Sequence, residues 1–179
     1  DVGARKLVNG PEAFTPDGNF ILGEAPEVAG FFVGAGFNAF GIASAGGAGK
    51  ALAQWIVGGE MPMDLWAVDI RRFGPHTADD DFNERRTTEA TAHHYAMSWP
   101  HEEWTSARGV RTSPLYDLLE ANGASFGEKL GWERPNWFAP EGEDPIDEHT
   151  YGRSNWFPHV GSEHQAARER VVLFDQTSF

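Results

Sequence analysis

The part of the sequence best suited to chemistry is the loop FNAFG at residues 37–41, which joins an apolar strand to a helix of small residues. The strand is GFFVGAG at residues 30–36, and the helix is predicted over residues 42–57. Backbone N–H groups and the positive end of the dipole at a helix start favour a polar or anionic part of a ligand. Gly and Ala there let a cofactor approach closely, although tight packing of a helix on a sheet explains the composition equally well.

Two nucleotide-binding motifs are absent from this stretch. A dinucleotide fingerprint needs G-x-G-x-x-G, but Ala39 stands where Gly34 and Gly36 require the third glycine. A phosphate-binding loop needs G-x-x-x-x-G-K-[ST], but Ser44 replaces its first glycine and Ala51 its final hydroxyl residue.

The seven His residues and the acidic clusters predict no metal site. His93 and His94 are adjacent, whereas helical zinc ligands lie four residues apart. The acidic residues at 79–81 and 141–148 lack the spacing of a calcium loop, so solvated loops explain them better. The Trp-rich stretches at 132–138 and 155–157 are better explained by packing than by a ligand channel.

Composition limits the partners. A formal charge of −13 without a basic patch argues against nucleic acid and against an anionic membrane. No uncharged apolar run is long enough to span a bilayer, and the absence of Cys excludes disulfides and thiolate chemistry. We expect a cytoplasmic protein, or one of the mitochondrial matrix if the source is eukaryotic.

The pattern of elements predicts an α/β (α+β) chain of more than one part. Short strands near residues 19–23 and 30–36 precede the small-residue helix, and residues 65–70 fit a further strand or a buried extended segment. The polar stretch GPHTADDD at residues 74–81 is the expected boundary. Both ends of the chain look like interior polypeptide, so we expect a segment of a larger protein.

Further elements are expected after the boundary. Helices are predicted over residues 83–98 and from the Ser113-Pro114 pair to Asn122-Gly123, with an extended arm at 131–140. The letters SEHQ at 162–165 fit a capping box, which predicts a helix through residue 170 and a last strand at 171–174.

Two stretches resemble known families. NGPEAFTPDGNF at residue 9 through DLWAVDIRRFG at residue 74 resembles the C-terminal end of the FAD domain of dimethylglycine and sarcosine dehydrogenases, within the D-amino-acid-oxidase-like flavoproteins. SPLYD, NGA, GWERP, the helix at 164–169 and LFDQTSF resemble the opening of the folate-binding aminomethyltransferase fold. The implied domains are 1–73, the C-terminal part of the FAD domain, 74–110, a central connector, and 111–179, the start of the aminomethyltransferase-like domain.

The resemblance implies a reaction and two cofactors. These enzymes oxidise an N-methylated glycine by hydride transfer to the flavin of FAD, and tetrahydrofolate in the C-terminal domain captures the one-carbon unit. The substrate is a small N-methyl amine such as dimethylglycine or sarcosine. A helix N-terminus beside the flavin pyrimidine would stabilise the negative charge that forms there on reduction.

The resemblance also assigns the residues of the loop. Gly41 and Ile42 would present backbone N–H groups to the flavin C2 carbonyl, and Phe40 would lie nearest the substrate. Ala43 stands where some relatives place a Lys that touches the flavin and the substrate carboxylate. The cofactor-binding residues implied in this way are Phe37, Asn38, Ala39, Phe40, Gly41 and Ile42.

No catalytic residue is assigned, because the expected catalytic groups of both domains lie outside the sequence, and we expect the chain alone to catalyse nothing. Two alternatives remain open. One is a non-catalytic interaction or assembly subunit, and the other is a stand-alone folate-binding aminomethyltransferase piece. Unpaired sheet edges further predict that the chain self-associates.

Overall fold

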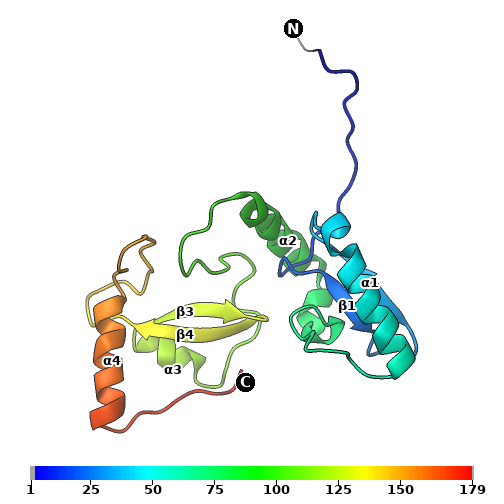
Figure 1. Cartoon of the computed structure of the whole chain (residues 1–179). Coiled ribbons are helices and arrows are strands. Elements are labelled where there is room, and N and C mark those ends of the chain that lie inside the picture. Colours follow the sequence, from blue (N-terminus) through cyan, green and yellow to red (C-terminus); the bar gives the residue numbers. More distant parts are fainter. Residues whose placement is uncertain (1–2, 179) are drawn as a thin grey trace. The chain divides into compact units, whose positions relative to one another are not determined.

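The computed structural model describes residues 3–178. Asp1, Val2 and Phe179, at the limits of the predicted domains, lie outside the described residues. The chain forms two compact units, Asp1–Thr77 and Ala78–Phe179, each with its own strands and helices (Figure 1). The expectation of an α/β (α+β) chain is therefore correct. The division at residues 73 and 110 stays a prediction.

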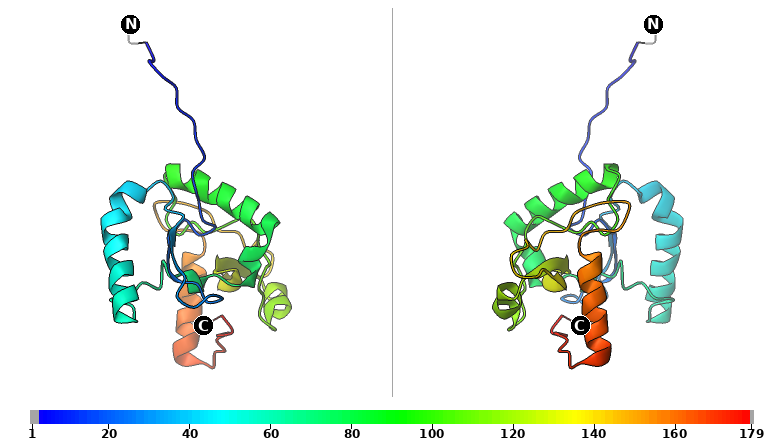
Figure 2. Two further views of the ribbon diagram at one scale, coloured as in Figure 1. Left: turned by 90° about the vertical axis from the view of Figure 1, so that its right-hand side faces the viewer. Right: turned by 90° about the vertical axis from the view of Figure 1, so that its left-hand side faces the viewer.

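The N-terminal unit is built on a hairpin with one helix lying against it. Strands β1 (Ile21–Glu24) and β2 (Phe32–Ala35) pair antiparallel, with Leu22 opposite Gly34. Leu22 is 1% exposed and is the centre of this small core. Residues 3–12, ahead of the turn that packs before β1, are exposed and run away from the unit as an extended stretch, which all views show (Figures 1 and 2).

Helix α1 (Gly41–Gly58) is buried along one stripe only. Ala48, Ala51 and Trp55 recur at the spacing of one helix face and are buried. The Trp55 ring stands edge-on to Phe32 of β2, with the ring centroids 5.9 Å apart. The helix ends at Gly59, whose left-handed backbone donates its N–H to Trp55 O. The predicted helix and its glycine stop are confirmed to within a residue at each end.

Residues 65–70 do not form the predicted strand. They are turns that lead into the 3₁₀ helix η1 (Ile70–Arg72), and one bridge joins Asp69 to Leu22. Leu22 N donates to Val68 O at 2.7 Å, so the segment lies against β1 without continuing as a ladder. The alternative, a buried extended segment, is not borne out either, because residues 66–68 are turns, Trp66 is 54% exposed and only Asp69 is fully buried.

The C-terminal unit begins with a polar helix. The 3₁₀ helix η2 (Pro75–Ala78) leads to α2 (Asp80–Tyr95). The carboxylate of Asp79 accepts from Phe82 N and caps the helix, so α2 starts three residues before the predicted Asn83. The acidic residues 79–81 of the expected boundary are thus the helix cap and its first turn, so the expectation of a solvated loop there is wrong.

A second hairpin carries the core of this unit. The short helix α3 (Tyr116–Ala121) precedes strands β3 (Ala124–Lys129) and β4 (Trp132–Phe138), which pair antiparallel. The register shifts between Ser125 and Phe126, where the chain accommodates Pro135 of the facing strand. The predicted extended arm is β4.

Two predictions near the C-terminus are wrong. Helix α4 (Phe157–Glu169) begins five residues before the supposed capping box, with Pro158 in its first turn. Ser162 lies inside the helix and donates its hydroxyl to Pro158 O. Residues 171–174 form no strand in the described structure and run exposed after α4 (Figure 2).

Candidate functional site

The loop between β2 and α1 has an unusual backbone. Asn38 and Ala39 are consecutive non-glycine residues with positive φ, at 48° and 67°. Gly36 has a φ of 61°, and a Cβ added to it would lie 2.7 Å from Thr15 Cγ2. Positive φ in residues with a side chain costs free energy, and it persists only where surrounding contacts hold it.

Asn38 supplies those contacts. Asn38 is 1% exposed, and its Oδ1 accepts a hydrogen bond from Thr15 N at 2.8 Å. Its Nδ2 donates to Gly36 O at 2.7 Å, and its backbone N–H donates to Ala13 O at 3.2 Å. The side chain therefore points into the protein, where it ties the loop to the segment before β1.

Phe37 is the second inward anchor. Its ring stacks on Phe20 with the centroids 5.0 Å apart and an interplanar angle of 17°. Phe37 and Asn38 were both predicted to bind the cofactor, and in the structure both side chains serve the packing of the loop. A cofactor could contact these two residues only through their backbone atoms or the edge of the Phe37 ring.

Of the remaining predicted residues, Ala39, Phe40 and Ile42 form the outward side of the loop, and Gly41 is half-buried. Ala39 is exposed, Phe40 is 55% exposed and Ile42 is fully exposed. Phe40 is the N-cap of α1 and has no side-chain group to bond the first N–H groups. No acidic residue occurs in the first turn. The N–H groups and positive dipole end of α1 are therefore available to an electronegative group, flanked by apolar side chains.

The glycines in the middle of α1 are not explained by packing within the described chain. The buried stripe carries Ala48, Ala51 and Trp55, whereas a Cβ added to Gly46, Gly47 or Gly49 would meet no other described residue within 4 Å. Close helix–hairpin contact does occur at Gly34, where an added Cβ would lie 3.0 Å from Leu52 Cδ1. The glycines of α1 face away from that contact.

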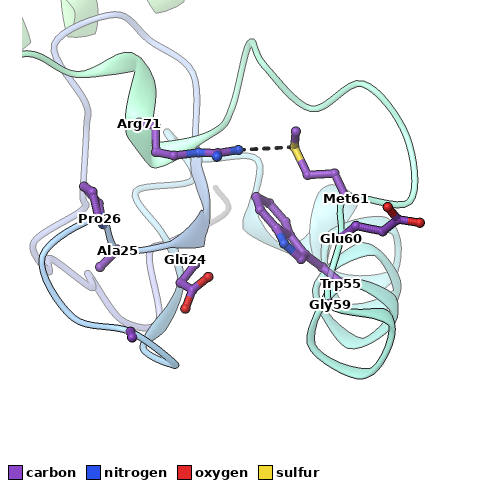
Figure 3. Close-up of a pocket in the computed structure, with 9 residues that line it drawn as sticks. Glu24, Ala25, Pro26, Trp55, Gly59, Glu60, Met61 and Arg71 are labelled. Carbon is purple, nitrogen blue, oxygen red and sulfur yellow. Dashed lines mark hydrogen bonds between the residues drawn. The ribbon is translucent and has the colours of Figure 1, made fainter.

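A pocket of about 500 Å³ lies at the other end of α1 (Figure 3). Arg71 extends across it, with its guanidinium carbon 5.6 Å from the Trp55 ring centroid and Nη2 3.7 Å from Met61 Sδ. Its Nε and Nη2 bind the fully buried carboxylate of Asp69. Burial raises the pKa of Asp69, but the hydrogen bonds from Arg71 outweigh it and leave that pKa below its usual value.

Arg72 connects η1 to the turn before β1. Its Nε lies 2.6 Å from Asp17 Oδ2, and its Nη2 donates to Asn19 O at 2.8 Å. Thr15 Oγ1 donates to the same Asn19 carbonyl at 2.7 Å. Because Thr15 also binds Asn38, the ion pair supports the loop through the turn. Sequence reasoning missed this support, and the only available signal was the T-P-D-G turn.

The C-terminal unit contains a set of hydrogen-bonded carboxylates that the sequence did not single out, and two of them, Glu128 and Glu133, are buried. Glu128 pairs with Arg86, and Glu133 pairs with Arg108 and accepts from Gly109 N. Glu103 accepts from Glu128 N at 2.8 Å, and Glu89 accepts from residues 105 and 106. Every one of these carboxylates has donors, so the set holds the unit together and offers no unsatisfied group for catalysis.

Two histidines of this unit pack against tryptophan rings. His159 stacks on Trp137 at 5.4 Å, and His93 lies 5.5 Å from the Trp104 ring. Trp137 is 2% exposed and donates its Nε1–H to Asp147. Across residues 3–178 no group of three or more metal-ligating side chains is assembled.

Two family models match the chain. A model described as the FAD dependent oxidoreductase central domain matches residues 58–113. A model described as the GCVT N-terminal domain matches residues 115–179. The first match begins after the loop at Phe37–Ile42, and it extends through α2 into the C-terminal unit.

Individual relatives match nearly the whole chain. The chain is 46% identical over 99% of its length to 4-methylaminobutanoate oxidase (formaldehyde-forming) of Paenarthrobacter nicotinovorans. It is 42% identical over 97% of its length to the mitochondrial pyruvate dehydrogenase phosphatase regulatory subunit of Mus musculus, and 40% identical over 99% to mitochondrial sarcosine dehydrogenase of Homo sapiens. It covers 22%, 20% and 19% of these relatives, about a fifth of their length.

Proposed function

The chain belongs to the family of FAD-dependent oxidoreductases that includes the sarcosine and dimethylglycine dehydrogenases, and we propose that it forms one wall of the FAD site in an enzyme that oxidises N-methylated amino acids. The proposed division is 1–73 for the end of the FAD domain, 74–110 for the connector and 111–179 for the start of the aminomethyltransferase-like domain. The activity belongs to the intact protein that contains this chain.

One observation carries the proposal. The exposed residues Ala39 and Phe40 lead directly to the N-terminus of α1, which has neither a side-chain cap nor a carboxylate in its first turn. These residues fit a flavin, because its pyrimidine end needs N–H donors and its ring needs an apolar neighbour. When bound, FAD accepts the hydride from the N-methyl carbon. Gly41 and Ile42 would hold the pyrimidine carbonyl, and Phe40 and Ile42 would exclude water from the ring.

The proposed substrate is a small amino acid with an N-methyl group. The relatives are named for sarcosine, dimethylglycine and 4-methylaminobutanoate, which share a methylated amine and a carboxylate. Arg71 and Arg72 both pair with buried or half-buried aspartates, and Lys50 lies about two turns along α1 from the loop, too far to reach a substrate there. We therefore place the carboxylate contact in the remainder of the protein.

Tetrahydrofolate is proposed as the second cofactor on the strength of the GCVT match at residues 115–179. One relative is named as formaldehyde-forming, so release of the one-carbon unit to water is the competing outcome. Formaldehyde measured during turnover with and without tetrahydrofolate separates the two. Transfer to folate predicts that added tetrahydrofolate suppresses free formaldehyde, and an unchanged yield would contradict it.

The relatives from mouse, human and rat are named as mitochondrial, and none of the helices in residues 3–178 is long and apolar enough to cross a bilayer. We propose the cytoplasm or, for a eukaryotic source, the mitochondrial matrix as the site of action.

The decisive test is reduction of bound flavin without oxygen. The intact protein containing this chain, loaded with FAD, is mixed anaerobically with sarcosine, dimethylglycine or 4-methylaminobutanoate, and with unmethylated glycine as the control. Bleaching of the flavin absorbance by a methylated substrate but not by glycine is the expected result. A protein that binds no FAD, or binds it and stays oxidised with all three, would instead act as an interaction or assembly subunit.

A further inference from the structure

Asn38 differs from its neighbours in the loop because it is both strained and buried. Its φ of 48° lies in the left-handed region, and the next residue, Ala39, has a φ of 67°. Asn adopts this region more readily than most residues, but Ala has no side-chain group to compensate for it. The conformation of Ala39 therefore depends on what holds Asn38.

The amide of Asn38 is fully engaged in holding the loop. Its Oδ1 accepts from Thr15 N at 2.8 Å, and its Nδ2 donates to Gly36 O at 2.7 Å. Thr15 Oγ1 lies 3.2 Å from the same Nδ2. With the residue 1% exposed, the side chain has no atom left for a ligand outside the loop.

The tether determines how the chain enters α1. After the two left-handed residues, Phe40 N donates to Phe37 O at 2.8 Å, and Ser44 N then makes the first helical bond to Phe40 O at 2.9 Å. The reversal directs Ala39 and Phe40 outward and leaves the N–H groups of the first turn at the surface. A loop that relaxed to negative φ would change the direction of these N–H groups.

The tether is itself supported from a distant part of the chain. Arg72, with 2% of its side chain exposed, binds Asp17 Oδ2 at 2.6 Å and Asn19 O at 2.8 Å. Thr15 donates to the same carbonyl of Asn19 and presents its own N–H to Asn38. The loop geometry is thus fixed by a chain of contacts from η1 through the turn before β1.

We infer that Asn38 is a positioning residue for the flavin, acting through the backbone of Ala39–Ile42 without touching the cofactor by its side chain. The inference rests on the proposed function. It also refines the expectation that the six loop residues bind the flavin: the side chains of Phe37 and Asn38 hold the loop, whereas Ala39, Phe40 and Ile42 are exposed.

The test uses the intact FAD-loaded protein with Asn38→Gly, Asn38→Ala and a control. Gly adopts positive φ freely, so Asn38→Gly removes the tether without adding strain. The control is Asn155→Ala, which removes another loop amide that bonds Glu148 N and Ile146 O in the C-terminal unit. The readouts are the flavin absorption spectrum and the equilibrium constant for flavin reduction against a reference dye.

Both Asn38 variants are expected to alter the flavin spectrum and to lower the reduction equilibrium constant about tenfold, because the N–H groups no longer meet the developing charge. Asn155→Ala should change neither. Thr15→Val, which removes only the hydroxyl partner, should have a smaller effect of the same sign and serves if the Asn38 variants do not fold.

The two ways of failing are distinct. Wild-type protein that binds no FAD overturns the proposed function and this inference together. Wild-type protein that binds FAD, with Asn38→Gly giving the same spectrum and the same reduction equilibrium, overturns this inference alone and leaves the flavin site standing.

Discussion

The guanidinium of Arg86 lies 2.6 Å from the carboxylate of Glu128, and both side chains are at most 3% exposed. The pair joins α2 to β3 over 42 positions in sequence. Arg86 also donates to Ser106 O at 2.7 Å. Residues matched by the FAD-oxidoreductase central-domain model therefore fold together with residues matched by the GCVT model.

Removing one member of this pair should destabilise the C-terminal unit strongly. Arg86→Met leaves the Glu128 carboxylate buried without its cation, which costs about 3–5 kcal/mol. The double variant Arg86→Met/Glu128→Leu should recover a large part of that loss, because no unpaired charge remains. Urea denaturation followed by far-UV circular dichroism measures both, and a loss below about 1 kcal/mol in the single variant would contradict the assignment.

Glu89 predicts a pH dependence of stability. Burial raises its pKa, but hydrogen bonds from the Ser106 hydroxyl and from Thr105 outweigh burial and lower the pKa from 4.5 to about 2. A depressed folded-state pKa gives stability that is complete above the unfolded pKa and is lost as the pH falls through the folded one.

The stability difference between wild type and Glu89→Gln should therefore be largest above about pH 5, on the order of 2–3 kcal/mol, and should shrink toward zero near pH 2. Because the other carboxylates titrate in both proteins, their contributions to the pH dependence of stability cancel in this comparison. The measurement is urea denaturation at a series of pH values. A difference that stays constant between pH 7 and pH 2 would be inconsistent with the low pKa.

We expect replacement of Gly123 to lower the stability of the C-terminal unit, for two separate reasons. Its φ is 81°, and an added Cβ would lie 2.5 Å from the carbonyl oxygen of Ala139. Gly142 is the matched control, because its φ is 91° but an added Cβ meets nothing within 4 Å. Gly142→Ala should cost about 1 kcal/mol from backbone strain alone, and Gly123→Ala at least twice that. Equal losses of stability in the two variants, measured by thermal denaturation, would show that the contact with Ala139 O is absent.

Elements whose formation depends on one stretch of the chain were predicted better from the sequence than elements that depend on contacts with distant residues. The spacing of Ala48, Ala51 and Trp55 and the Gly58-Gly59 stop are properties of one helix, and that helix was predicted to within a residue at each end. The last strand was predicted from the apolar run at residues 171–174, but a strand needs a partner, and within residues 3–178 the run has none. High strand propensity alone does not supply a partner strand.

The candidate site was likewise predictable only in part. The position of the loop before α1 followed from the change of pattern between strand and helix. Which of its residues turn inward depends on Thr15 and Gly36, one of which is 23 positions from Asn38. The support from Arg72 spans 53 positions to Asn19. Such pairings are set by the fold and leave no periodic signal in the sequence.

The chain expressed alone should self-associate. Val171, Leu173 and Phe174 are 98%, 77% and 74% exposed in an extended stretch with free strand-like edges. We expect a dimer or larger species by light scattering at micromolar concentration, and Leu173→Lys should shift it toward monomer. A clean monomer for the unmodified chain would count against this.

A single charge placed at the N-terminus of α1 tests whether this end of the helix faces the flavin. Ala43→Asp puts a carboxylate in the exposed first turn, where it should stabilise the helix by about 0.3–1 kcal/mol through the dipole. The same charge should oppose flavin reduction. Gln54→Glu, exposed near the other end of α1, is the matched control.

The measurement is the equilibrium constant for flavin reduction in the intact protein. We expect Ala43→Asp to lower this constant about tenfold or more, since a charge within roughly 6 Å acts at an effective dielectric constant of about 20. Gln54→Glu should leave it unchanged. A constant that is the same in wild type and Ala43→Asp, with FAD bound in both, would place the flavin elsewhere.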